Sequence, residues 1–334
     1  MTCTIIVGGF FGDEGKGKIV SYLAVKDKIA VAARGGVGPN AGHSVVWKGT
    51  KYKMRMLPST FLYEKSRLLI GPGVLVDPIV FLKEVEETKT ASRVGVDPQC
   101  AIIEPQHIER DRGSTHLKSR IGTTGTGCGP CNEDRIKRIG KVARDVTQFK
   151  RFLTDVPFEV NRAIDEGKQV LLEGTQGTFL SVFHGSYPYV TSKDVTASSI
   201  AADVGVGPKL IDDVLVVFKA YVSRVGGGEL KGELSNEEAD KRGWSEVATV
   251  TGRRRRAAPF DFELAKRAVM LNSATQLAIT KVDVVFPKCN GVTDRDQLSD
   301  EAITFIKRIE SETGVPVTLL GTGPSVNEIV DLRS

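Results

Sequence analysis

Residues 12–18, with sequence GDEGKGK, combine glycines, lysines and carboxylates directly after an apolar run at residues 4–7. Glycines let backbone N–H groups wrap an anion, and lysines add positive charge to it. Carboxylates at such a site would repel a phosphate unless a metal ion or a proton transfer needs them. The segment therefore predicts phosphate chemistry. Its structural alternative is a glycine-rich turn that caps a helix starting near Lys16.

The segment is nearly a P-loop. Gly12, Gly17 and Lys18 match the pattern G-x-x-x-x-G-K. The next residue is Ile19, where a P-loop places the Ser or Thr that binds magnesium. Asp13 is the candidate replacement for that ligand, and its carboxylate could also accept a proton.

The sequence contains four histidines, of which one stands near this motif. His43 lies in a loop rich in Gly and Asn, where a proton donor would serve phosphate chemistry. His107 and His116 fall in a charged, helix-like stretch, which predicts surface positions. The pattern around His184 favours neither a surface position nor a functional one.

Residues 280–283, with sequence TKVD, follow an apolar run that predicts a strand. The Asp283 carboxylate can accept hydrogen bonds from N1–H and the exocyclic amine of guanine, whereas adenine has no donor at N1. Lys281 can lie over the base. The alternative is a strand end with a surface ion pair. Together with the phosphate loop, the motif predicts a guanine-nucleotide site like the N/T-K-x-D motif of unrelated GTPases.

Four consecutive arginines at residues 253–256 form the densest charge in the chain. Alternate side chains of an extended segment point to opposite sides. Arg253 and Arg255 can therefore share a face and grip a dicarboxylate through bidentate contacts. The alternatives are a solvated run and a nucleic-acid patch. Because no aromatic residues interleave with the arginines, we expect no nucleic-acid partner.

Composition is that of a globular protein with a packed core, since 40% of the 334 residues are hydrophobic and 26% are charged. The net charge of +5 is mild and suits an anionic small-molecule substrate. No apolar run approaches the ~20 residues of a membrane span, and the first residues lack the pattern of a signal peptide. We therefore expect a cytoplasmic protein without a membrane partner.

The five cysteines predict no secreted disulfide framework, because their number is odd. Cys128 and Cys131 form a C-G-P-C motif like that of thioredoxin-like proteins. We expect this motif inside a loop rather than at a strand-to-helix junction, so a redox function is rejected. A single pair also disfavours a four-cysteine zinc site. The prediction is a local disulfide or two inert thiols.

These motifs need a scaffold, and short β-branched runs alternate with helical patterns along the chain. Strands are predicted at residues 4–7, 29–33, 67–70, 170–172, 214–218, 277–280 and 315–320. Helices are predicted at residues 80–87, 146–166, 260–272 and 300–313. The alternation predicts a central, mostly parallel, twisted α/β sheet with helices on both faces.

In such a sheet, ligands bind at the carboxyl ends of strands, which is where residues 12–18 and 280–283 are expected. Binding loops are predicted at residues 35–43, 121–130, 185–199 and 226–232. No linker or internal repeat is visible in the sequence. The prediction is a single large catalytic domain over residues 1–334.

Taken in order, the motifs resemble the adenylosuccinate synthetase family, and in length the chain resembles its compact archaeal type. The matching runs are residues 12–18, 40–43, 121–125, 173–178, 184–192, 251–256, 280–283 and 322–324. They span nearly the whole chain in the family's order. The resemblance implies a ligase that couples IMP to L-aspartate, with GTP as co-substrate and Mg²⁺ as cofactor, on the way to AMP.

The resemblance also implies catalytic roles. Asp13 would remove the N1 proton of IMP and bind Mg²⁺, with the Gly42 carbonyl as a second metal contact. His43 would be the general acid on the β-phosphate side, and Gln176 would contact the purine near O6. The intermediate would be 6-phosphoryl-IMP, from which the amino group of aspartate displaces phosphate.

Binding residues follow from the same resemblance. GTP would contact Gly12, Gly15, Lys16, Gly17, Lys18, Gly42, His43, Ser44, Arg255, Lys281, Val282, Asp283, Gly321, Thr322 and Gly323. IMP would contact Asp13, Glu14, Lys16, Asn40, Ala41, Gly42, Thr124, Gln176, Thr191 and Arg253. L-Aspartate would contact Val250, Thr251, Arg253 and Arg255.

Arg138 matches an arginine that family members insert into the IMP site of the neighbouring subunit. This match implies a homodimer with active sites shared across the interface. From the residues alone, the alternative for Arg138 is a basic helical surface.

The chain departs from the family's common pattern at several places. Phe10 and Phe11 replace a Gln-Trp pair, and the loop at residues 35–39 is longer than usual. Val250 stands where Thr is common, and Gly321 stands where Ser often precedes the T-G-P run. The last two changes concern single hydrogen bonds rather than the activity.

Two other functions stay open on the sequence. Short viral relatives join aspartate to dGMP, but they carry Ser where this chain has Asp13. A GTP-binding switch protein without ligase activity would explain the phosphate loop and the TKVD motif. It would not explain residues 40–43, 185–191 or the arginine run.

Overall fold

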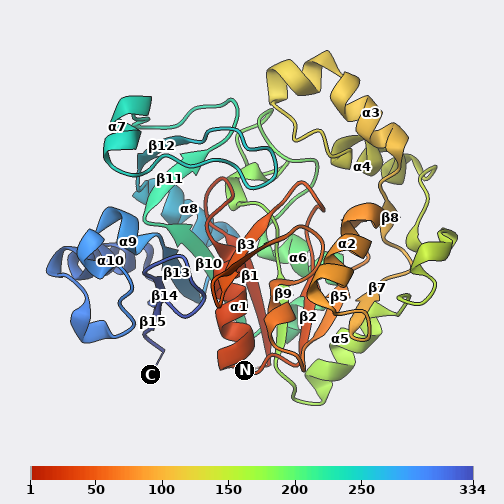
Figure 1. Ribbon diagram of the computed structural model, residues 1–334, viewed down its shortest axis with the longest axis horizontal. Coiled ribbons are helices and arrows are strands. Elements are labelled where there is room, and N and C mark those ends of the chain that lie inside the picture. Colours follow the sequence, from red (N-terminus) through yellow and green to blue (C-terminus); the bar gives the residue numbers. More distant parts are fainter. Residues whose placement is uncertain (1, 334) are drawn as a thin grey trace.

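The core of the structure is a nine-stranded sheet with the strand order β15-β14-β13-β10-β1-β9-β2-β5-β7 (Figure 1). The computed structural model describes residues 2–333. The strands of this sheet are β1 Cys3–Gly8, β2 Val31–Arg34, β5 Arg67–Ile70, β7 Val94–Val96, β9 Val170–Glu173, β10 Asp213–Lys219, β13 Gln276–Thr280, β14 Val317–Gly321 and β15 Ile329–Asp331. Neighbouring strands are parallel except for the antiparallel pair β14 and β15. The predicted mostly parallel sheet is confirmed.

Helices and three short strand pairs surround this sheet. The strand pairs are β3 His43–Trp47 with β4 Thr50–Met54, β6 Leu75–Val76 with β8 Ala101–Ile102, and β11 Tyr221–Arg224 with β12 Arg256–Pro259. The helices are α1 Lys16–Lys26, α2 Pro78–Thr88, α3 Pro105–Gly113, α4 Cys128–Lys137, α5 Val156–Asp165, α6 Ala197–Val204, α7 Asn236–Lys241, α8 Phe262–Asn272, α9 Val282–Val285 and α10 Asp300–Thr313. Across residues 2–333, none of the helices has the length and apolar character needed to cross a membrane.

The sheet is covered on both faces, as its apolar strands require. Successive side chains of a strand point to opposite faces. In β1, Ile5 and Val7 therefore pack in a core cluster that includes Ile200 of α6. Ile6 packs in a different cluster, with Ile19 of α1. The central strands are buried from both sides, which fixes the position of the loops that follow them.

The loops after parallel strands gather at one edge of the sheet. Strands β1, β2, β9, β13 and β14 run in the same direction, so their carboxyl ends lie at one edge of the sheet. The segments that follow these strands therefore start at that edge. Figure 1 shows these strands rising toward the loops at the top of the view. Ligand sites of α/β sheets lie at this edge.

One predicted helix is wrong in its extent. Residues 146–166 do not form a continuous helix, because a short 3₁₀ turn at Thr147–Phe149 is followed by a turn at residues 150–152 and an irregular segment before α5 begins. Asp155 caps α5, and its side chain accepts a hydrogen bond from the Phe158 N–H at 3.0 Å. An Asp N-cap followed by Pro in the first turn is a strong start signal for a helix.

Two predicted loops also end earlier than expected. Residues 121–130 run into α4, which begins at Cys128, and residues 185–199 run into α6, which begins at Ala197. The C-G-P-C motif therefore lies in the first turn of a helix and not inside a loop. Cys128 and Cys131 are free, buried thiols. Burial raises the pKa of Cys128 to about 11 and that of Cys131 to about 12, so neither is a reactive thiolate.

The predicted surface position of His107 is wrong. Its side chain is buried between α3 and α4. Nδ1 accepts a hydrogen bond from the Glu104 N–H at 2.9 Å, and Nε2 lies 3.0 Å from Asp134 of α4. His107 thus caps one helix and links it to the next. His116 is exposed, as predicted.

Candidate active site

A cavity of about 770 Å³ opens at the carboxyl edge of the sheet. Most of the predicted site residues line it: Gly12, Asp13, Gly15, Lys16, Gly17, Lys18, Asn40, Ala41, Gly42, His43, Ser44, Thr124, Gln176, Thr191, Val250, Thr251, Arg253, Arg255, Lys281, Asp283 and Gly323. Four others are buried behind its wall: Glu14, Val282, Gly321 and Thr322. Arg138 is exposed at the end of α4, away from the cavity lining.

The phosphate loop joins β1 to α1 and is held by one buried carboxylate. Glu14 accepts hydrogen bonds from the backbone N–H groups of Gly12 at 2.7 Å and Phe10 at 3.2 Å. Its other oxygen accepts a bond from Lys16 Nζ at 2.8 Å. Gly12 has a φ of 85°, which glycine adopts without strain. Glu14 therefore shapes the loop from behind, while Asp13 faces the cavity.

Lys18, which matches the P-loop lysine, makes backbone contacts at the far side of the cavity. Its Nζ donates to the carbonyl groups of Gly323 at 2.5 Å and Glu328 at 2.7 Å. Burial lowers the pKa of Lys18 to about 8, although the Asp283 carboxylate opposes this shift. The side chain thus ties α1 to the loop after β14.

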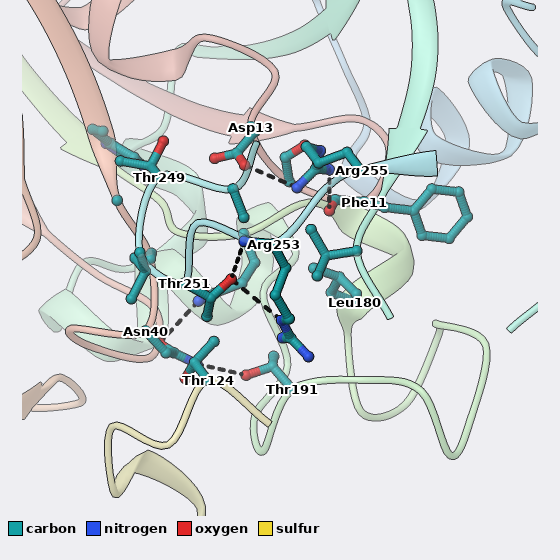
Figure 2. A pocket seen from close by; sticks show the side chains of 18 of the residues that line it. Phe11, Asp13, Asn40, Thr124, Leu180, Thr191, Thr249, Thr251, Arg253 and Arg255 are labelled. Atoms are coloured by element: carbon teal, nitrogen blue, oxygen red, sulfur yellow. Dashed lines mark hydrogen bonds and ion pairs between the residues drawn. The ribbon is translucent and has the colours of Figure 1, made fainter. Parts of the chain in front are cut away.

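Asp13 and Arg255 form an ion pair in the wall of the cavity. Arg255 Nη1 lies 2.8 Å from Asp13 Oδ2, and Figure 2 shows the two side chains pointing toward each other. Arg255 also donates to the carbonyl groups of Gly12 at 2.9 Å and Ser223 at 2.7 Å. This guanidinium is only 4% exposed. It fixes the phosphate loop against β11 and holds the Asp13 carboxylate in position.

The arginine run alternates as its sequence predicts. Arg253 and Arg255 line the cavity. Arg254 pairs with Asp240 at 2.8 Å and Arg256 pairs with Glu233, and these two ion pairs lie outside the cavity. Arg253 donates to the Gly122 carbonyl at 2.7 Å. Figure 2 shows Arg253 beside Thr251. Arg253 and the Thr251 hydroxyl therefore border the cavity beside the residues that hold the phosphate loop.

His43 begins β3 and lies beside a buried ion pair that the sequence analysis did not identify. Its Nδ1 contacts Glu173 Oε1 and lies 2.8 Å from Arg34 Nη1. Arg34 Nη1 is also 2.8 Å from Glu173 Oε1. Because the carboxylate is an acceptor, Nδ1 carries the hydrogen, and Nε2 is left without a protein partner among residues 2–333.

The environment sets the protonation of this group. Burial, reinforced by the Arg34 charge, lowers the pKa of His43 to about 4. Burial would raise the pKa of Glu173, but Arg34 and His43 outweigh this effect and hold it at about 2. The imidazole is therefore neutral at neutral pH until an anion approaches Nε2.

One sequence signal could have identified this pair. Arg34 and Glu173 are paired in register as the last residues of the adjacent strands β2 and β9. A charged residue that ends an apolar strand lies at the ligand edge of a parallel sheet. Glu173 falls within a run that matches the family, but no role followed from that match.

Uncharged side chains joined by hydrogen bonds border another part of the cavity (Figure 2). Gln176 Nε2 donates to Asn40 Oδ1 at 2.9 Å, and Asn40 Nδ2 donates to Thr191 Oγ1 at 3.2 Å. The side-chain oxygen Oε1 of Gln176 is buried and has no partner within the described part of the chain. Paired amides and hydroxyls with one open acceptor can read the edge of a purine.

The TKVD motif lies next to the phosphate loop. Thr280 Oγ1 donates to the Glu14 carbonyl at 2.6 Å and so joins the two motifs. Asp283 Oδ1 is buried without a partner among residues 2–333, and burial raises the pKa of this carboxyl against the effect of Lys281. An orphaned carboxylate oxygen in a ligand cavity can accept a hydrogen bond from a ligand.

The predicted Mg²⁺ ligands, Asp13 and the Gly42 backbone, both line the cavity. Mg²⁺ in proteins is usually bound through one or two carboxylates, with substrate phosphates and water as the other ligands. One carboxylate and one carbonyl beside a phosphate loop fit that pattern. Residues 2–333 contain no cluster of three or more His, Cys, Asp or Glu side chains arranged for a metal ion.

Comparisons with known proteins agree with this geometry. The family model for adenylosuccinate synthetase matches residues 5–154 and 141–289. The adenylosuccinate synthetase of Archaeoglobus fulgidus is 57% identical over 100% of this chain and 99% of its own length. The adenylosuccinate synthetase of Methanocaldococcus jannaschii is 56% identical over 100% of this chain and 98% of its own length.

Solved structures share the fold. The fully ligated adenylosuccinate synthetase of Plasmodium falciparum has a TM-score of 0.91 at 24% identity, covering 98% of this chain and 99% of that one. The succinoaminodeoxyadenylate synthetase of cyanophage S-2L, bound to dGMP and dATP, has a TM-score of 0.82 at 24% identity, covering 100% and 96%. On the family match and the full-length archaeal identities, this chain belongs to the adenylosuccinate synthetase family.

Proposed function

We propose that this chain ligates L-aspartate to IMP with GTP as co-substrate, giving adenylosuccinate, GDP and phosphate, and that the whole chain acts as one catalytic domain. The observation that carries the proposal is a single cavity that joins the Asp13–Arg255 pair, the His43 Nε2 and the orphaned Asp283 oxygen. The Asp13 carboxylate can abstract a proton, His43 Nε2 can stabilise a phosphate leaving group, and the Asp283 oxygen can accept hydrogen bonds from a guanine base.

The substrates occupy three parts of the cavity. The guanine base of GTP lies at Lys281 and Asp283, with its phosphates along residues 12–18. The purine of IMP lies against Asn40 and Gln176, whose hydrogen-bonded amides leave one carbonyl oxygen open. L-Aspartate lies at the Arg253 face. Each part offers the polar groups that its ligand needs.

In the first step, the Asp13 carboxylate takes the N1 proton of IMP, and the charge moves to O6. O6 then attacks the γ-phosphorus of GTP, the bond to the β,γ-bridging oxygen breaks, and GDP leaves. Protonated His43 donates toward the β-phosphate as negative charge develops there. The product of this step is 6-phosphoryl-IMP.

In the second step, the amino group of aspartate attacks C6 of the purine. The C6–O6 bond breaks and releases phosphate, which takes the proton that the amino group loses. Arg253 holds a carboxylate of the incoming aspartate, as its place in the cavity and its planar donors support. Mg²⁺, when bound by Asp13 and the Gly42 carbonyl, supplies positive charge to the phosphate oxygens.

The test of this function is a coupled assay. Purified protein is mixed with GTP, MgCl₂ and L-aspartate, and either IMP or dGMP is added. With IMP, we expect equal molar amounts of adenylosuccinate, followed by its absorbance, and of released phosphate. With dGMP, we expect neither product. Turnover with dGMP alone would assign the chain to the branch that acts on a 2-aminopurine. Phosphate release without either purine would indicate a GTPase.

We further propose that the protein is a homodimer in which Arg138 completes the partner's IMP site. Arg138 is exposed at the end of α4, away from the lining of its own cavity. Ile136 and Ile139 beside it are each 70% exposed. Exposed apolar side chains around a functional residue are typical of an interaction surface.

Co-expression of two variants tests the shared site. Asp13→Asn and Arg138→Leu are each expected to be nearly inactive as homodimers. Heterodimers isolated through two different tags contain one site with both native residues, so about half of the wild-type kcat per dimer should return. If Arg138 served its own subunit's site, the heterodimer would have no complete site and would stay inactive.

A further inference from the structure

We propose that Glu246 is a positioning residue that holds the Lys281 ammonium at the nucleotide base and is itself held by the buried Lys219. The inference rests on the proposed function, because it takes Lys281 and Asp283 as the guanine site. Glu246 was not singled out by any sequence motif.

The two carboxylate oxygens of Glu246 face different partners. Oε2 accepts a hydrogen bond from Lys219 Nζ at 2.5 Å. Oε1 lies 3.4 Å from Lys281 Nζ. The side chain is 18% exposed and lines the cavity, whereas Lys219 is 1% exposed. One oxygen is thus fixed from inside the protein, and the other is presented to the ligand site.

The position of Glu246 is fixed through its backbone as well. The Arg255 N–H donates to the Glu246 carbonyl at 2.8 Å. Arg255 Nε donates to Ser223 Oγ at 2.8 Å, and the same hydroxyl contacts Lys219 Nζ. The carboxylate is therefore anchored to the residues that hold Asp13.

A buried lysine paired with a glutamate is a costly arrangement. Removing both charges from water offsets most of their mutual attraction, so such a pair adds little to stability. Burial lowers the pKa of Lys219, although Glu246 opposes this. The two lysines outweigh the effect of burial on Glu246 and hold its pKa at about 2. The carboxylate is ionised at neutral pH, and its second oxygen is available to Lys281.

Lys281 needs such a partner. Its side chain is 45% exposed, and its backbone has a φ of 59° directly after β13. A free lysine loses rotamer entropy when a ligand fixes it. An ion pair formed before the nucleotide arrives restricts the side chain in advance, so less entropy is lost on binding. Glu246 therefore affects the affinity for the nucleotide, while Asp283 selects the base.

The first test is Glu246→Asp, which keeps a charge for Lys219 but withdraws the carboxylate from Lys281 by one methylene group. We expect the Kd for GDP to rise about fivefold, the upper range for loss of one partly exposed ion pair. The Kd for IDP should rise by the same factor, and kcat at saturating GTP should stay within about twofold of wild type. The matched control, Asp283→Asn, should instead abolish the preference for GDP over IDP.

A double-mutant cycle separates this role from a general loss of structure. In the Lys281→Met background, Glu246→Asp should change the GDP affinity by less than about twofold, because the pair is already broken. Equal losses in both backgrounds, an unchanged GDP affinity or a fall in kcat alone would each overturn the inference. A wild-type protein without preference for GDP over IDP would contradict the guanine site and therefore the proposed function.

Discussion

Asp13→Asn is expected to lower kcat by about 10³–10⁴-fold, the upper range for loss of a general base. An amide has nearly the shape of a carboxylate but cannot take the N1 proton. Asp13 has a φ of 57°, a conformation that Asn tolerates better than most residues. Asp13→Asn therefore removes the proton acceptor with little backbone strain. Ala at this position would add more strain, because it adopts a positive φ less readily than Asn.

The measurement is steady-state kcat with IMP, GTP and aspartate, together with thermal unfolding. Arg255 keeps its bonds to Ser223 and to the Gly12 carbonyl when the ion pair is lost, so we expect a folded protein. The matched control is Asp240→Asn, which breaks the exposed ion pair with Arg254 in the same arginine run. It should leave kcat unchanged. A near-normal rate in Asp13→Asn would exclude the proton-acceptor role.

His43→Asn is expected to lower kcat by about 10²–10³-fold, because no group would then donate a proton toward the β-phosphate. Glu173 keeps hydrogen bonds from the Ser59 N–H at 2.6 Å and from Ser59 Oγ at 2.7 Å, so the buried carboxylate stays satisfied. The control is His184→Asn, because His184 is exposed and does not line the cavity. An unchanged kcat in His43→Asn would remove the imidazole from the mechanism.

Protonation provides a second measurement at this position. The pKa of His43 is about 4 in the free protein, below its ordinary 6.5, because of burial and the Arg34 charge. A triphosphate near Nε2 raises that pKa, so GTP binding takes up a proton and weakens as pH rises through the bound value. Calorimetry in buffers of different ionisation enthalpy should show a larger proton uptake in wild type than in His43→Asn.

The lowered pKa of His43 also makes the stability of the folded protein depend on pH. Between pH 6.5 and about 4 the unfolded chain protonates this histidine and the folded protein does not. The free energy of unfolding should therefore fall as pH falls through this window. His43→Asn should lack this component, which pH-dependent denaturant unfolding of both proteins can detect.

The sequence determined those features that rest on local periodicity and on short motifs. The strand at residues 67–70 and the helix at residues 300–313 have the predicted limits in β5 and α10. Opposite faces for alternate arginines also follow from the local geometry of extended chain. The resemblance to the family rests on runs of this kind, and the comparisons confirm it.

Tertiary structure alone decided the contacts between residues that lie far apart in the sequence. Arg34, His43 and Glu173 meet because β2 and β9 are neighbours in the sheet. Only after burial does the Arg34 charge lower the pKa values of both His43 and Glu173. Lys219, Glu246 and Lys281 meet in the same way. No local pattern encodes such a contact, because desolvation and charge pairing arise only when the packed sheet brings these side chains together.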